Sequence, residues 1–314
     1  MATVPVWVWA SFLAFMAAMM ALDLGVFHRK AHAVSLREAG IWTAVWVSLA
    51  LIFDLGILKI QGPTRALEFL TGYVIEESLS VDNLFVFLVI FRYFALPEKH
   101  YHRVLIWGII GAVILRGVMI FGGVALVNSF SWTLYLFGAL LVYTAVKLFF
   151  EEDTRVEPEK NPLVRLARLV FPVTHDYVGG RFFTASRTGW PAMTPMFIVL
   201  MVVSTADVVF AVDSIPAVFA VTRDPFIIFT SNMFAVMGLR SVFFLLAGVL
   251  PKFRFLKPGL SFALFFIGAK MLLEKWVHIP VFVSLGAVAG ILAVAVLASW
   301  LFPAKPVVKR KRGK

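Results

Sequence analysis

The chain has 314 residues, of which 61% are hydrophobic and 15% are charged, and its formal net charge is +11. Soluble domains carry about 25% charged residues, so this composition excludes an ordinary soluble globular protein and indicates a polytopic membrane protein. The sequence has no cysteine, which excludes disulfides, thiolate metal sites and thiol redox chemistry in the chain itself.

Nine apolar windows follow one another along the chain, and most are near the roughly 17–25 residues that a membrane helix needs. Acidic motifs interrupt the third and the sixth window. The sequence therefore predicts an all-α polytopic membrane protein with about nine transmembrane helices in one domain, residues 1–302. The windows are 5–27, 41–58, 66–91, 104–128, 131–150, 192–221, 225–250, 259–276 and 280–302.

Two polar segments lie outside these windows. Residues 151–190 hold three prolines and a Gly-Gly pair, and we expect a cytoplasmic loop with one short amphipathic helix near Leu163–Leu169. Residues 303–314 form a basic tail that cannot build a core. We expect the tail to lie on anionic lipid at the cytoplasmic surface, and we expect no nucleic acid as a partner.

The basic residues alternate between the two sides of the windows. If the N-terminus is outside, 21 of the 29 lysines and arginines fall in cytoplasmic segments and 4 fall in outer ones. Cytoplasmic loops of membrane proteins are rich in these residues. The distribution predicts an N-out, C-in topology. The remaining four basic residues lie inside windows, at Arg116, Lys147, Arg240 and Lys270.

Short segments recur along the chain in the same order. Leu115–Val118 resembles Leu239–Val242, and Tyr143–Leu148 resembles Phe266–Met271. Windows three to five (about 66–150) therefore match windows six to eight (about 192–276). Because each copy has three helices, an odd number, the copies must face opposite ways across the bilayer. The sequence thus predicts an inverted repeat, as in many transporters.

Two acidic pairs, Glu76/Asp82 and Asp207/Asp213, lie inside the repeated windows at the same spacing of six residues. A carboxylate in hydrocarbon costs roughly 2.5–3.5 kcal/mol even on lenient insertion scales, so it is rarely present without a function. Equivalent positions of an inverted repeat meet near the bilayer midplane. We expect these four acids to bind a hard divalent cation such as Mn²⁺, Mg²⁺ or Ca²⁺.

Further polar residues are candidates to support or neutralise this site. The supporting candidates offer oxygen or amide groups: Ser80, Asn83, Ser214, Asp23 and Asn232. The charge-compensating candidates are Arg116, Arg240, Lys147 and Lys270. Since four cations match four acids, simple neutralising pairs are the alternative to a metal site. The two readings are compatible, because cations can hold an empty site together.

The cations are expected to behave in two ways. Lys147 and Lys270 lie near window ends and are predicted to extend to the headgroups. Arg116 and Arg240 sit deeper, with no acid within a turn of either, so they need partners on another helix. The six histidines fall in loops or at window ends and are expected to be solvated.

These motifs resemble the TerC/Alx family of bacterial integral membrane proteins over roughly residues 20–300. The resemblance implies a nine-helix fold in the bacterial inner membrane and manganese(II) export from the cytosol, with older labels of tellurite resistance and redox modulation. Ser204 stands where many members carry a glutamate, a departure that would weaken the site or change its proton coupling. The matching segments are Leu22–Gly25 with His28-Arg29, Glu76–Asn83, Phe210–Ala217, Thr230–Asn232 and Gly238–Arg240.

The leading expectation is a Mn²⁺ efflux transporter without a permanently bound cofactor, in which proton exchange through the carboxylates releases the metal. The alternative is a non-transport membrane partner in metal delivery to secreted enzymes, or in the response to tellurite or pH stress, with residues 151–190 as its docking surface. An enzyme is not expected, because the sequence shows neither a nucleophile–base arrangement nor a phosphate-binding glycine loop. A homo-oligomer is left open.

Overall fold

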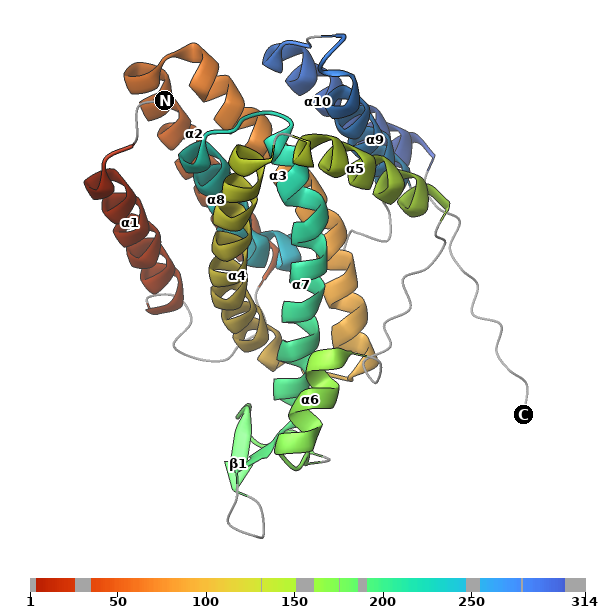
Figure 1. Cartoon of the computed structure of the whole chain (residues 1–314). Helices are drawn as coiled ribbons and strands as arrows, with labels where there is room; N and C mark the ends of the chain where they lie inside the picture. The colour runs from red at the N-terminus through yellow and green to blue at the C-terminus, as the bar shows by residue number, and fades with distance from the viewer. Residues whose placement is uncertain are drawn as a thin grey trace.

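The structure is a computed structural model that describes residues 4–25, 35–130, 132–150, 161–174, 176–185, 191–246, 255–277 and 279–302 (Figure 1). Two short strands, β1 (Phe183–Ala185) and β2 (Pro191–Met193), pair antiparallel. All other elements are helical. They are α1 (Val6–Gly25), α2 (Leu36–Gln61), α3 (Pro63–Tyr93), the 3-10 helix η1 (Glu98–His100), α4 (Tyr101–Ser129), α5 (Thr133–Phe150), α6 (Pro162–Val170), α7 (Pro195–Phe219), α8 (Pro225–Leu246), α9 (Leu256–Leu273) and α10 (Val281–Leu301).

Each of the nine apolar windows coincides with a long helix of the structure. Among the described residues, seven of these helices are long and apolar enough to cross a membrane. The other two are α1, whose apolar part Val6–Leu22 is shorter, and α3, a continuous helix whose sequence contains the first acidic motif. The protein is therefore an all-α polytopic membrane protein, as predicted. The number of spans and the N-out, C-in orientation stay predictions.

Local sequence signals set several helix boundaries. Gly62 separates α2 from α3 with a φ of 90°, a left-handed conformation that favours glycine, and proline follows at the first position of α3. The Ser35 hydroxyl accepts a hydrogen bond from the Glu38 amide at 3.2 Å and so caps the start of α2. Asp224 caps α8 in the same way by accepting from the Phe226 amide at 2.9 Å.

The described residues between α5 and α7 form regular secondary structure as well as loops. The amphipathic helix α6 lies where it was predicted, and Asn161 caps it by accepting from the Val164 amide at 3.2 Å. The β1–β2 hairpin was not predicted. The Tyr177 hydroxyl donates to the Phe94 carbonyl at 2.7 Å, which ties this segment to the end of α3.

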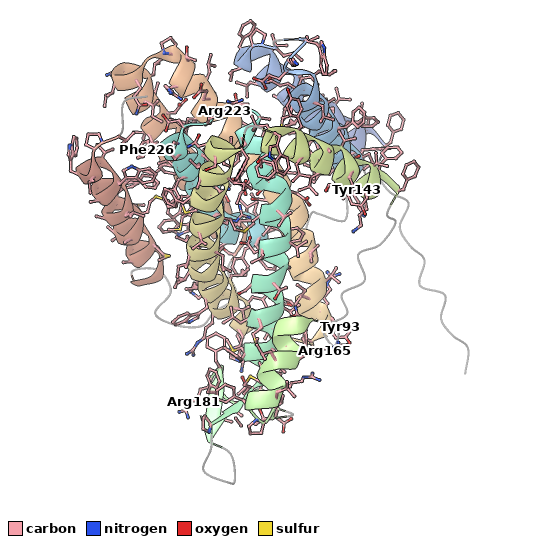
Figure 2. The ribbon with its side chains drawn as sticks, in the orientation of Figure 1. Tyr93, Tyr143, Arg165, Arg181, Arg223 and Phe226 are labelled. Carbon is pink, nitrogen blue, oxygen red and sulfur yellow. The ribbon has the colours of Figure 1, made fainter. Side chains whose placement is uncertain are left out.

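The bundle has two ends of different character. Arg165 and Arg181 lie at one end, with the hairpin, and Arg223 lies at the other (Figure 2). We call these the Arg181 end and the Arg223 end. The α3–α4 link lies at the Arg181 end, where Tyr177 contacts Phe94, and the α7–α8 link lies at the Arg223 end, where Asp224 contacts Arg65.

The packing joins helices from both predicted repeats. Helix α3 packs against α7 and α8, α4 packs against the same two helices, and α5 packs against α9. In Figure 1, α4 and α7 stand side by side, while α5, α9 and α10 gather on one flank. In the predicted repeat, α3, α4 and α5 correspond to α7, α8 and α9. The contact between α3 and α8 therefore corresponds to the contact between α7 and α4. This pattern is what an inverted repeat would produce, and the repeat itself stays a prediction.

Candidate ion site and its buried charge cluster

One arginine lies at the centre of the polar interior. Arg116 is on α4 with 0% of its surface exposed. It donates to both carboxylate oxygens of Asp207 on α7, at 2.9 Å from Nη2 and 3.2 Å from Nε. Its Nη1 donates to Glu76 on α3 and to the amide oxygen of Asn232 on α8, the latter at 3.3 Å. Four helices therefore meet at one guanidinium.

We call Glu76, Arg116, Asp207 and Asn232 the Arg116 cluster. Glu76 and Asp207 are 0% and 3% exposed, so neither charge is solvated by bulk water. Buried charges persist when they are paired and hydrogen-bonded. Two carboxylates and one guanidinium leave a formal charge of −1 when all are ionised. Arg116 was predicted to need partners on another helix, and its partners come from three helices, α3, α7 and α8.

Several buried polar atoms of the cluster, and of residues within two helical turns of Glu76 or Asp207, have no hydrogen-bond partner among the described residues. Glu76, Ser80 and Asn83 occupy one face of α3, as their spacing of four and seven residues predicts. Most buried polar groups are hydrogen-bonded, so a group of unpartnered ones calls for an occupant such as water or an ion. Three of these atoms are oxygens of the kind that hard cations prefer. The atoms are Glu76 Oε2, Ser80 Oγ, Asn83 Nδ2, Ser214 Oγ and Asn232 Nδ2.

The second described acid of α7 has a different environment. The Thr144 hydroxyl of α5 donates to Asp213 Oδ1 at 2.9 Å. Positions six apart on a helix are about 240° apart around its axis, so Asp207 faces α4 while Asp213 faces α5. Thr144 was not among the predicted site residues, although it lies in the repeated segment Tyr143–Leu148.

The structure thus brings together two of the four predicted acids. Within the described ranges, no three Asp, Glu or His side chains lie close enough to hold a metal ion. The side chains of Asp82 and Asp23 fall outside the described residues. The four-acid metal site stays a prediction, while the Glu76–Arg116–Asp207 contacts show that neutralisation by a cation is present for two of its members.

The other three cations have unlike surroundings. Arg240 on α8 donates from Nη1 to His102 Nδ1 at 3.0 Å, since an arginine cannot accept. His102 lies at the start of α4 and is half-buried, so it is only partly solvated, and it pairs with Arg240. Lys147 is exposed, as expected for a side chain that extends to headgroups, whereas Lys270 is only 7% exposed.

A small cavity lies between Asp207 of the Arg116 cluster and Arg240. Asp207 and Arg240 both line it, together with apolar side chains of α3, α4, α7 and α8. Its volume of about 10 Å³ is roughly what one water molecule requires. The surface that lines the cavity is apolar, so the cavity itself provides no polar path from the cluster to Arg240.

Comparison with known proteins gives a consistent family. Residues 61–306 match the model described as "Integral membrane protein TerC family". The chain is 52% identical over 291 residues to "Uncharacterized membrane protein STKORF319" of Myxococcus xanthus, which covers 93% of this chain and 91% of that protein. It is 48% identical over 298 residues to "Putative membrane-bound redox modulator Alx" of Photorhabdus laumondii, covering 92% and 93%. The protein of the same name from Escherichia coli K12 is 45% identical over 303 residues, covering 93% and 94%. No solved structure matches.

Proposed function

We propose, from the premise that the chain belongs to the TerC family of integral membrane proteins, that it transports a divalent metal ion and that its cargo is manganese(II) leaving the cytosol. One observation carries the proposal. The Arg116 cluster holds two carboxylates with a net formal charge of −1 among helices of a membrane protein. Ionisable residues inside membrane segments are rare, and they mark substrate or ion pathways, proton relays, voltage sensors or counter-ions of ligands.

Arg116 donates hydrogen bonds to the carboxylate oxygens that an incoming cation would need as ligands. A divalent ion would compete with the guanidinium for Glu76 and Asp207, and the unpartnered oxygens of Ser80 and Ser214 are further donors. Mn²⁺ accepts carboxylate, carbonyl and hydroxyl oxygens, and this chain has no thiolate to favour a softer metal. Arg116 then acts as a built-in countercharge that stabilises the empty site and withdraws when the ion binds.

Export requires an energy source. An inside-negative membrane potential opposes cation efflux by about 2.3 kcal/mol per charge per 100 mV. Protonation of Glu76 and Asp207 would weaken metal binding, so inward movement of protons through the same carboxylates can release the ion outside. The bacterial inner membrane, which carries both the potential and the proton gradient, is the location that this coupling needs.

The test is a comparison of cytosolic manganese and manganese tolerance in bacteria without their own exporters. Cells would carry the native chain, the Glu76→Gln/Asp207→Asn variant or the Asp82→Asn/Asp213→Asn variant at matched membrane levels. Glu98→Gln is the matched control, because this carboxylate is exposed on η1. We expect the native chain and the control to lower manganese and both double variants to fail. A native chain without effect on manganese would refute the cargo, and activity in both double variants would refute the site.

A second candidate function is a non-transport membrane partner in metal delivery or stress response. The observation that favours it is the folded segment of α6 and the β1–β2 hairpin, which gives the Arg181 end a structured surface. If the native chain does not change manganese, deletion of residues 161–194 against a point variant within α6 would test this function by co-purification of membrane partners. The names of two relatives contain the words "redox modulator", but this chain has no cysteine and therefore no thiol for redox chemistry.

A further inference from the structure

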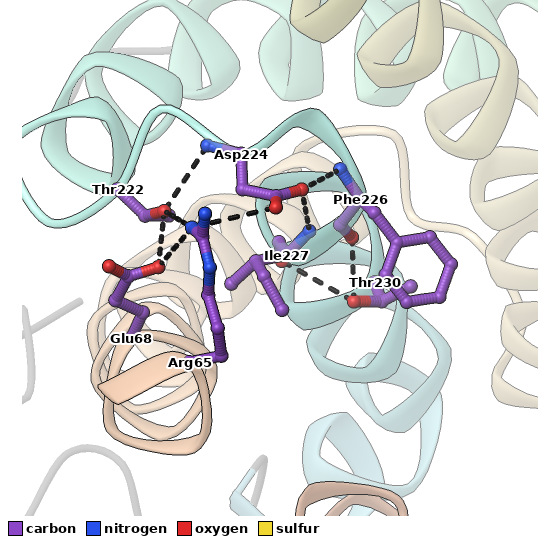
Figure 3. Close-up of polar contacts among 7 residues, drawn as sticks. All are labelled: Arg65, Glu68, Thr222, Asp224, Phe226, Ile227 and Thr230. Atoms are coloured by element: carbon purple, nitrogen blue, oxygen red, sulfur yellow. Dashed lines mark hydrogen bonds and ion pairs between the residues drawn. The ribbon is translucent and has the colours of Figure 1, made fainter. Parts of the chain in front are cut away.

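A polar network links α3 to the α7–α8 connection at the Arg223 end (Figure 3). Arg65 Nη1 donates to Glu68 Oε2 at 2.8 Å and lies 3.5 Å from Asp224 Oδ2. The Thr222 hydroxyl donates to the same Glu68 oxygen at 2.7 Å. We call these four residues the Arg65 network. Because its members come from the start of α3 and from the link before α8, it joins the two predicted repeats.

Asp224 has two separate tasks in this network. Its Oδ1 caps α8, accepting from the Phe226 amide at 2.9 Å and the Ile227 amide at 3.4 Å. Its Oδ2 faces Arg65. Asparagine is as good an N-cap as aspartate, so Asp224→Asn removes the ion pair and keeps the cap. The chain therefore offers a variant that separates the stability of α8 from the link to α3.

Three members of the network, Arg65, Glu68 and Thr222, form one wall of a cavity of about 530 Å³. The start of α5, the end of α7 and the end of α9 form the other walls, with Phe219 and Met271 toward the interior. Charged side chains of both signs line the cavity, including Arg223 and Glu274. This is a polar recess that opens on the Arg223 end of the bundle.

Helices α3, α7 and α8 close tightly between this recess and the Arg116 cluster. A Cβ added at Gly72 would lie 2.9 Å from Ser231 Oγ and 3.2 Å from Val218 Cγ1. On α3, Gly72 stands midway between Glu68 of the network and Glu76 of the cluster, on the same face and about 12 Å apart end to end. On α8, Ser231 directly precedes Asn232. We call Gly72, Val218 and Ser231 the constriction.

We propose that the Arg65 network is a latch that holds the constriction closed, and that its opening connects the Arg116 cluster to the recess at the Arg223 end. This proposal rests on the transport function proposed above, since only a transporter needs to expose its site to each end in turn. The latch fixes the start of α3 to the start of α8, the two helices that meet at the constriction. Separation of α3 and α8 at the constriction would open a path from the recess toward Glu76.

The absence of cysteine from the chain makes a direct test available. Ser231→Cys places a single thiol at the constriction, at a position that is 0% exposed. The protein in lipid nanodiscs would be treated with a polar maleimide, and the labelling rate measured by mass spectrometry. Variants in this background are Arg65→Gln and Asp224→Asn. The control is Arg223→Gln, which removes an exposed arginine lining the same recess but outside the latch.

We expect Arg65→Gln and Asp224→Asn each to label about two- to fivefold faster than the parent, the factor that loss of a partly exposed ion pair corresponds to, and Arg223→Gln to label at the parent rate. Equal rates in the parent and in both latch variants would overturn the latch, and so would an equal acceleration in the control. Thermal unfolding of Asp224→Asn checks whether α8 is destabilised. We expect no loss of stability, because asparagine retains the cap. Labelling does not depend on manganese, so faster labelling in a chain that fails to export manganese keeps the latch and refutes only the cargo.

Discussion

Removing the Arg116 side chain tests the central electrostatic argument. Arg116→Met keeps most of the volume but leaves Glu76 and Asp207, at 0% and 3% exposure, without their shared cation. Breaking a buried ion pair by deleting one partner costs about 3–5 kcal/mol, because the remaining charge is desolvated and unpaired. Here two carboxylates lose the same partner, so we expect the upper part of that range. Thermal unfolding in nanodiscs, followed by the fluorescence of the nine tryptophans, measures the loss.

A compensated variant makes the result specific. Arg116→Met/Glu76→Gln/Asp207→Asn leaves no charge within the Arg116 cluster, so it should recover most of the stability lost in Arg116→Met. The matched control is Lys147→Met, an exposed lysine, which should change stability by less than about 0.5 kcal/mol. The reasoning is refuted if Arg116→Met unfolds at the same temperature as Lys147→Met, or if the triple variant is less stable than the single one.

Three further predictions concern other parts of the chain. Gly72→Ala should destabilise by about 1–3 kcal/mol through overpacking against Ser231 Oγ, 2.9 Å from the new Cβ, and Ser231→Ala should restore part of the loss in thermal unfolding. Tyr177→Phe should speed proteolysis of residues 171–194, since it removes a hydrogen bond that contributes about 0.5–1.5 kcal/mol. Burial raises the pKa of Tyr177 from 10.0 to about 12. The stability that this tyrosine contributes should therefore be constant below pH 10 and fall as the pH rises toward 12. The rate of proteolysis of the native chain, measured against pH, would reveal this loss. Single cysteines at Glu98 and Arg223 should react with impermeant reagents from the cytosolic and the outer side respectively, and the reverse pattern would contradict the N-out topology.

The sequence by itself determined the class of fold and the positions of its long helices. In a bilayer every backbone polar group must be bonded internally, so apolar stretches of sufficient length have almost no alternative to the helix. Helical spacing also placed Glu76, Ser80 and Asn83 on one face of α3, because that relation lies within a single helix. Interruptions by acidic residues did not displace α3 or α7 from their predicted ranges.

Only the tertiary structure decided which polar residues meet. Spacing could show that Arg116 needed a partner on another helix, but the choice of Glu76, Asp207 and Asn232 depends on how α3, α4, α7 and α8 pack. The same packing turns Asp213 toward Thr144 and places His102 beside Arg240. Such pairs join residues far apart in the chain, and their geometry follows from helix rotation and crossing, which no local pattern of residues records.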